Sequence, residues 1–179
     1  MAILPIRIYG DPVLRKKAAP IGEITDEIRK FVDDMAVTMF DAPGIGLAAP
    51  QVGKSVRLFI VDPHLGESES DTQEFVAFIN PVLREKSDDR VLIEEGCLSL
   101  PDIRADVERP RTLTVDFTDL HGERHTAVIG GMLARVIQHE NDHLDGILFV
   151  DRINPVRRRL LGKQLKQLSR SQKKNRVAA

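Results

Sequence analysis

Apolar residues recur with a helical period near the N-terminal end of the chain. Behind Thr25 and two acidic residues, apolar side chains occupy positions i, i+3, i+4, i+7 and onward, namely Ile28, Phe31, Val32, Met35, Ala36, Met39 and Phe40. This spacing, with a hydroxyl cap and an acidic first turn, is typical of an amphipathic helix. Asp11 followed by Pro12 predicts a short earlier helix, because proline is favoured at the first helical position.

Two more helices are predicted in the second half of the chain. The helical period restarts after the glycines at 130 and 131 and can end at Gly146, since glycine is favoured just beyond a helix. Its apolar positions are Met132, Val136 and Ile137. A last helix is predicted to begin at Asn154 and Pro155. One apolar stripe is expected on it, formed by Val156, Leu160, Leu161, Leu165 and Leu168.

Between these helices the pattern changes to that of strands. Residues 56–62, VRLFIVD, and 75–82, FVAFINPV, are β-branched and aromatic runs. Residues 112–129 alternate apolar and polar positions around a turn at 120–122, which predicts a hairpin. Helices at both ends of a strand-rich middle indicate an α+β fold with antiparallel strands. We expect the strands to pack around the helix predicted after Gly131, with helices at both termini.

The composition is that of one globular domain. With 179 residues, of which 42% are hydrophobic and 30% charged, the chain can bury a sizeable core and does not resemble a disordered protein. No apolar run approaches the roughly 20 residues of a membrane helix, and the first residues lack a secretion signal. The single cysteine, Cys97, cannot form an internal disulfide, which fits a reducing compartment. We therefore predict a cytoplasmic protein.

The stretch QHENDH, residues 138–143, carries the clearest chemistry. His139 and His143 are four residues apart, so on a helix both imidazoles face one metal ion. Glu140 lies beside them, where it can act on a water at that metal. Many proteins with H-E-x-x-H take a third ligand from downstream. Here Phe149 occupies the position of the downstream histidine, and no His follows His143 and no Glu follows Glu140.

The third ligand must therefore lie upstream, if the motif is not accidental. His64 begins a polar loop, His121 lies in the hairpin turn and His125 in a strand, and all three are expected at the surface. Cys97 differs, because Gly96 before it allows the backbone to approach another group closely. A lone cysteine is more often a small buried apolar residue. The unpartnered histidine pair favours Cys97 as the ligand.

Three motifs together resemble the signatures of the peptide deformylase family. They are GIGLAAPQ at 44–51, EGCLS at 95–99 and QHENDH at 138–143, in the family's order and at similar separation. The resemblance extends from YGDPVLRKKAAPI at 9–21 to the C-terminal helix. The glycine-rich motif alone would indicate no more than a turn, because it lacks the G-K-[ST] of a phosphate loop. The resemblance implies that Cys97, His139 and His143 are the metal ligands.

The resemblance also implies a reaction. The family's substrate is the N-formyl-methionyl end of a nascent polypeptide, and the products are formate and a free amino terminus. Three protein ligands leave one metal position open, as in catalytic sites. Glu140 is implied as the general base and acid that works on a metal-bound water. The side-chain amide of Gln51 and the backbone N–H of Leu98 are implied to stabilise the formyl oxygen.

Substrate contacts follow from the same resemblance. The backbone around Ile45, Gly46 and Gly96 is implied to pair with the extended peptide as an added strand. Ile45, Met132 and Val136 are implied to lie near the methionine side chain. Core packing is the alternative for these three apolar residues, and each could serve both purposes.

Three polar positions have less specific roles. Arg104 matches a family position near the substrate, but an arginine there is equally consistent with a surface ion pair. Gln138 and Asp142 complete the third motif. They are expected as supports of the ligating histidines, because such histidines usually need a neighbour that holds the ring.

The metal is predicted from two considerations that disagree. One cysteine and two histidines suit zinc by ligand preference, and the order of divalent affinities also favours zinc over ferrous iron. The family resemblance instead implies iron(II). We predict Fe2+ as the working metal, with Zn2+ or Ni2+ as occupants of a purified sample.

Two other classes of function are considered. A zinc metallopeptidase would share His139, Glu140 and His143, but it should supply a downstream third ligand, which this sequence lacks. The second is a non-catalytic metal-binding or RNA-binding module. A structural metal site should have a fourth protein ligand, and seven Phe and one Tyr offer few stacking surfaces. Sequence-specific DNA binding is not expected.

Charge divides the chain into two parts. Of 26 basic and 27 acidic residues, ten basic and no acidic residues follow Asp151. Residues 1–151 therefore carry 16 basic and 27 acidic side chains, a net charge of −11. We predict that residues 1–151 form the catalytic part and 152–179 a basic helix and tail of the same domain. Because nascent chains emerge from an RNA-rich particle, the basic helix is predicted to dock on the ribosome.

Overall fold

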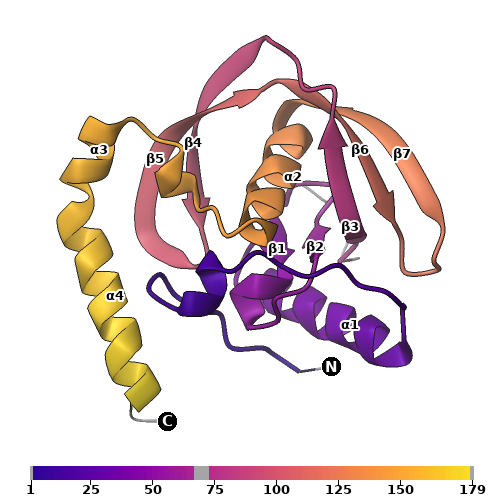
Figure 1. Ribbon diagram of the computed structural model, residues 1–179, viewed down its shortest axis with the longest axis horizontal. Coiled ribbons are helices and arrows are strands. Elements are labelled where there is room, and N and C mark those ends of the chain that lie inside the picture. The colour runs from indigo at the N-terminus through magenta and orange to yellow at the C-terminus, as the bar shows by residue number, and fades with distance from the viewer. Residues whose placement is uncertain (1, 67–72, 178–179) are drawn as a thin grey trace.

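The computed structural model describes residues 2–66 and 73–177, with side chains for 2–66 and 73–172. Within these ranges the chain has an α+β fold, as predicted (Figure 1). Its elements are η1 (Pro12–Arg15), α1 (Asp26–Asp41), β1 (Gly46–Ala48), η2 (Ala49–Val52), β2 (Leu58–Val61), β3 (Val76–Arg84), β4 (Arg90–Cys97), β5 (Leu100–Pro110), β6 (Thr112–Thr118), β7 (Arg124–Gly130), α2 (Gly131–Leu144), η3 (Phe149–Asp151), α3 (Pro155–Leu160) and α4 (Gly162–Val177). The η segments are short 3-10 helices.

The strands form two antiparallel sheets. The larger has the order β1-β2-β3-β6-β7, and the smaller is the hairpin β4-β5. β2 lies within its predicted run, β3 extends two residues beyond its run, and the β6-β7 hairpin extends one residue beyond the predicted range, so the three strand predictions are confirmed. The backbone of Gly122 adopts φ +88° in the β6-β7 turn, where residues with a side chain are strained.

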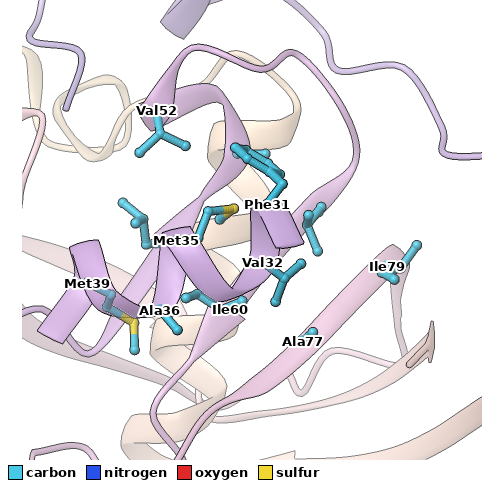
Figure 2. Packing of buried hydrophobic residues seen from close by; sticks show 12 residues of the cluster. Phe31, Val32, Met35, Ala36, Met39, Val52, Ile60, Ala77 and Ile79 are labelled. Atoms are coloured by element: carbon cyan, nitrogen blue, oxygen red, sulfur yellow. The ribbon is translucent and has the colours of Figure 1, made fainter. Parts of the chain in front are cut away.

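Helices α1 and α2 cover opposite faces of the larger sheet. Strand β2 is buried throughout: Leu58 and Ile60 pack with α1, whereas Phe59 and Val61 pack with α2. A strand buried on both faces reads as a continuous apolar run, as LFIV does. Figure 2 shows the α1 side, where Met35 and Met39 point toward the sheet. The cap at Thr25 is as predicted, since its hydroxyl accepts a hydrogen bond from the backbone of Ile28.

Helix α2 lies in the middle of the molecule. In Figure 1 the β4-β5 hairpin passes on one side of it and the β6-β7 hairpin on the other. Its buried residues contact both sheets, as predicted for the helix that carries QHENDH. Because a central helix is shielded from water on most sides, polar side chains on it are held in fixed surroundings.

The sequence analysis does not predict β1, β4 or β5. Charged residues dominate the outer positions of β4 and β5, and prolines at 101 and 110 argue against a strand. The inward positions of β5 nevertheless alternate, with Ile103, Ala105 and Val107 buried. These residues pack with Leu14 of η1 and with η3 and α4 in a third apolar cluster. The prolines are tolerated because they lie near the two ends of the strand.

The prediction of a single C-terminal helix with one apolar stripe is wrong in two respects. The helix is interrupted at Leu161, between α3 and α4. The predicted apolar stripe is also divided, because Val156 and Leu160 are 69% and 71% exposed whereas Leu165 is 6% exposed. Leu161 and Leu168 pack beside Leu165 in the third cluster. At about 100° per residue, the two exposed side chains point roughly a quarter turn or more away from the others.

Several predictions fall at the limits of the described chain. The predicted polar loop of residues 64–74 lies partly outside the described residues, as do the side chains of the basic residues after 172. No helix among the described residues is long and apolar enough to cross a membrane. The cytoplasmic location stays a prediction.

Gly146 provides a test of how the end of α2 is packed. Its φ is +71°, and a Cβ atom there would lie 2.7 Å from the carbonyl oxygen of Arg15. Gly146→Ala should destabilise the fold by at least about 1–2 kcal/mol from backbone strain alone. At roughly 2–4 °C per kcal/mol, thermal unfolding should show a clear decrease in Tm. Gly22→Ala is the control, since nothing lies within 4 Å of its Cβ position; equal Tm values for the two variants would contradict the prediction.

Candidate metal centre

Helix α2 presents three polar side chains to the interior. His139 and His143 are one turn apart, with ring centroids at 5.1 Å, and Glu140 lies between them in the chain. All three are buried: His139 is 9% exposed, Glu140 4% and His143 1%. Burial lowers the pKa of His143 well below its ordinary value, so this ring is neutral, the form that binds a metal.

Cys97 reaches the two histidines from the end of β4. The tight β4-β5 turn pairs Cys97 with Leu100, which turns the thiol toward α2. Ligand atoms of Cys97, His139 and His143 lie within 4.8 Å of one another. The sulfur of Cys97 is 3.3 Å from Nε2 of His143. One thiol and two imidazoles at this separation fit a tetrahedral Zn2+ or Fe2+ ion with one position open.

Glu140 is unusual because its buried carboxylate lacks a full set of partners. Its Oε2 has no hydrogen-bond partner among the described residues. Burial raises the pKa of Glu140 to about 7, in spite of the neighbouring His139, which lowers it. Gly46 makes room for this carboxylate, since a Cβ atom there would lie 2.6 Å from Oε1. A buried and unsatisfied carboxylate destabilises a fold, so its presence points to a chemical role.

Glu95 holds His139 in place, and the sequence analysis does not assign it a role. Its Oε2 lies 3.0 Å from Nδ1 of His139, so the other ring nitrogen is the one available to a metal. Arg109 donates two hydrogen bonds to the same carboxylate, of 2.6 and 2.9 Å, and Arg135 donates one of 2.7 Å. Burial alone would raise the pKa of Glu95, but hydrogen bonds from His139 and Arg109 outweigh it and lower the pKa to about 2.

The sequence carries a signal for this ion pair. Glu95 continues the inward-facing positions of Val91 and Ile93 on β4. Arg109 likewise continues the inward positions of Ala105 and Val107 on β5. A period of two predicts that both charges face the core, where an acid and a base must pair.

Gln51 is a further polar side chain in contact with the thiol of Cys97. Its Oε1 accepts a hydrogen bond of 2.7 Å from the backbone N–H of Ala48. The amide nitrogen must therefore face the site, where it lies 3.5 Å from the sulfur of Cys97 and 3.3 Å from the hydroxyl of Ser99. Gln51 is 1% exposed, so this orientation is fixed by its surroundings.

A cavity of about 530 Å³ opens onto these groups. Of the predicted ligands, catalytic groups and substrate contacts, all line it except His143, whose Nε2 lies 3.3 Å from the sulfur of Cys97. The lining residues among them are Ile45, Gly46, Gln51, Gly96, Cys97, Leu98, Arg104, Met132, Val136, His139 and Glu140. Ile45 and Val136 also pack with Phe59 and Val61 on the α2 side of the larger sheet, which is the core packing given as the alternative. Their contact with a methionine side chain stays a prediction. Met132 is 42% exposed at the cavity.

Arg104 lies at the cavity with a largely exposed side chain. Its guanidinium is 4.0 Å from the carboxylate of Glu94, and the two side chains are 70% and 59% exposed. An ion pair of this length and exposure contributes little to stability. The alternative of a surface ion pair is therefore observed, whereas the contact of Arg104 with a substrate stays a prediction.

Gln138 and Asp142 do not support the histidine rings directly. Gln138 donates to the backbone oxygens of Pro110 and Ala134, which ties α2 to β5. Asp142 accepts hydrogen bonds from Arg109 and Arg152. Among the described residues neither side chain hydrogen bonds to His139 or His143, and Asp142 is linked to His139 only through Arg109 and Glu95.

The remaining histidines lie outside the site, as expected. His64 pairs with Glu74 at 3.0 Å, and His125 with Asp119 at 2.8 Å. Both rings are exposed, and so is His121 in the β6-β7 turn.

Comparison with known proteins identifies the family of this chain. A family model described as polypeptide deformylase matches residues 3–159. The peptide deformylase of Brucella suis is 43% identical over 169 residues, covering 94% of this chain and 95% of that protein. The peptide deformylase of Cytophaga hutchinsonii is 45% identical over 168 residues, covering 94% and 91%. The crystal structure of the Plasmodium falciparum peptide deformylase has a TM-score of 0.88 at 35% identity, covering 94% and 97%. The chain therefore belongs to the polypeptide deformylase family.

Proposed function

We propose that this protein hydrolyses the N-formyl group of formyl-methionyl nascent polypeptides, releasing formate and a free amino terminus. One observation carries the proposal: Cys97, His139 and His143 converge at a cavity beside the unsatisfied carboxylate of Glu140. Membership of the deformylase family supports it. Residues 1–151 are the proposed catalytic part, and 152–179 belong to the same domain.

Cys97, His139 and His143 are the proposed ligands of an iron(II) ion, with zinc or nickel as substitutes. When bound, the ion supplies a Lewis acid that polarises the formyl oxygen and acidifies a water. Glu95 fixes the ring of His139 for this purpose. The thiolate of Cys97 lowers the net charge at the site, so proton removal depends more strongly on a neighbouring base.

Glu140 is the proposed base and acid. A carboxyl with a pKa of about 7 can accept a proton from the attacking water and return it to the departing amine near neutral pH. As water adds to the formyl carbon, negative charge grows on the formyl oxygen. The amide of Gln51 and the backbone N–H of Leu98 donate to that oxygen. The C–N bond then breaks, and the amine leaves with the proton.

The peptide is proposed to bind in extended form along the cavity. Backbone at Ile45, Gly46 and Gly96 pairs with it as an added strand, a mode that leaves alternate side chains in pockets. Ile45, Met132 and Val136 contact the methionine side chain, and Arg104 lies further along the peptide.

The direct test is formate release from formyl-Met-Ala-Ser by protein prepared without oxygen. Turnover that requires the metal is expected. The alternative is a zinc metallopeptidase, which would instead cleave unformylated peptides. Peptide-bond cleavage without formate release would contradict the proposal.

A substitution tests the role of Glu140. Glu140→Gln should keep about one metal ion per chain, because Glu140 is not among the proposed ligands. Deformylation should fall by at least roughly 100-fold, since the proton acceptor is lost. Glu94→Gln is a matched control at the rim of the same cavity. Activity of the Glu140 variant equal to that of the control would remove Glu140 from the mechanism.

The identity of the metal can be tested by exposure to air. A ferrous ion held by the chain's one thiolate is open to oxidation at both iron and sulfur. The iron form should lose activity in air, whereas a Ni2+ or Co2+ form should persist. Activity half-lives are measured with the same formyl peptide, and equal half-lives would count against iron as the active metal.

We further propose that α4 docks on the ribosome. Lys163, Lys166 and Arg170 line a hollow of about 460 Å³ on its exposed side. No acidic residue follows Asp151 in the chain, although Arg158 pairs with Asp151 itself at 2.7 Å. Residues 1–151 carry a net charge of −11 and would be repelled by RNA phosphate, so attraction requires a local basic surface.

Charge substitutions test the docking better than a truncation. Removing α4 would also remove Leu165, which is buried in the third cluster. The triple change of Lys163, Lys166 and Arg170 to Gln should reduce co-sedimentation with ribosomes and lower its log–log salt slope by about two to three. Turnover of a short formyl peptide should stay unchanged. The control changes three exposed cations elsewhere to Gln: Lys17, Lys86 and Arg124. Equal co-sedimentation of both triples would refute the docking.

A further inference from the structure

A continuous chain of charged contacts runs from the surface to the proposed metal site. Arg152 donates to both oxygens of Asp142, at 2.6 and 2.5 Å. Asp142 also accepts from Arg109 at 2.8 Å. The Nε and Nη2 atoms of Arg109 donate to the two carboxylate oxygens of Glu95. Oε2 of Glu95 lies 3.0 Å from Nδ1 of His139. Each link is short enough to be a charge-assisted hydrogen bond.

Arg152 is the outer end of this chain. Its side chain is 40% exposed, whereas those of Asp142, Arg109 and Glu95 are 8%, 3% and 6% exposed. It directly follows η3, whose Asp151 pairs with Arg15 and Arg158. The position of Arg152 is therefore set by the segment that leads into the C-terminal helices.

Arg109 is shared between two buried carboxylates. Arg152 satisfies both oxygens of Asp142, which leaves the paired donors of Arg109 for Glu95. Without Arg152, Asp142 would be a buried carboxylate with one cationic partner, and it would draw Arg109 more strongly. The grip of Arg109 on Glu95 would then weaken, and the ring of His139 would be held less firmly.

We infer that Arg152 is a positioning residue for His139, acting through Asp142, Arg109 and Glu95; this rests on the proposed metal site. This positioning effect and a charge effect through space change the metal affinity in opposite directions when Arg152 is removed. Removing a cation near a metal site favours metal binding by Coulomb's law. Loosening of the contact chain disfavours it, because ligand orientation is lost. Metal affinity therefore separates the two effects.

The experiment measures Co2+ affinity by competition with a chelator, together with the visible absorption spectrum of the Co2+ form. Arg152→Gln should bind Co2+ about 10-fold more weakly, the lower end of the effect of changing partners of ligating histidines. Its spectrum should shift, because the ligand geometry changes. Arg152→Lys keeps the positive charge but lacks the two parallel N–H donors of the guanidinium, so it should recover part of the Co2+ affinity.

Controls distinguish this inference from the proposed function. Arg157→Gln removes a 62% exposed arginine that pairs with Asp106 at 3.7 Å, and it should bind Co2+ like the wild type. If Arg152→Gln does not fold, Arg152→Met, with similar length and no charge, takes its place. If the folded Arg152 variant binds Co2+ as tightly as the wild type, or more tightly, the inference is overturned and the proposed metal site is not. Failure of the wild type to bind Co2+ would overturn the proposed metal site and the inference together.

Discussion

The buried carboxylate of Glu95 joins the two parts of the chain that make up the site. It lies on β4, two residues before Cys97, and contacts His139 and Arg135 of α2 and Arg109 of β5. A charge in the interior must be paired. The β4-β5 hairpin and α2 therefore pack in the one arrangement that lets these contacts form. That arrangement brings the thiol within reach of the two imidazoles. The cavity, which Gly96 and Cys97 help to line, depends on it in turn.

Two neighbouring carboxylates have opposite properties because their partners differ. Glu95 is surrounded by cations and hydrogen-bond donors, and its pKa falls to about 2. Glu140 has an oxygen without a partner among the described residues, and its pKa rises to about 7. The first carboxylate stays charged and holds a ring in place. The second can exchange a proton near neutral pH, which is the division of roles expected where two acids act in one site.

Prediction from sequence succeeded where local patterns are strong. The periodic apolar positions of α1 and the caps at Asp11 and Thr25 correspond to observed elements. β5 was missed because charged residues and terminal prolines obscure its alternation, and these are tolerated in a two-stranded sheet that is exposed on its outer side. The prediction of one C-terminal stripe failed because the helix is interrupted at Leu161 and the apolar side chains do not share one face; Leu165 is buried, whereas Leu160 is exposed.

For the site, the sequence alone determined the chemical groups and their local spacing. His139 and His143 share a helix face because they are four residues apart, and the absence of a downstream ligand directs attention to Cys97. The pairing of Glu95 with Arg109, and the reach of Arg152 to Asp142, were decided by the tertiary structure. Periodicity indicates which face of an element a side chain occupies, but the choice of a partner depends on how separate elements pack.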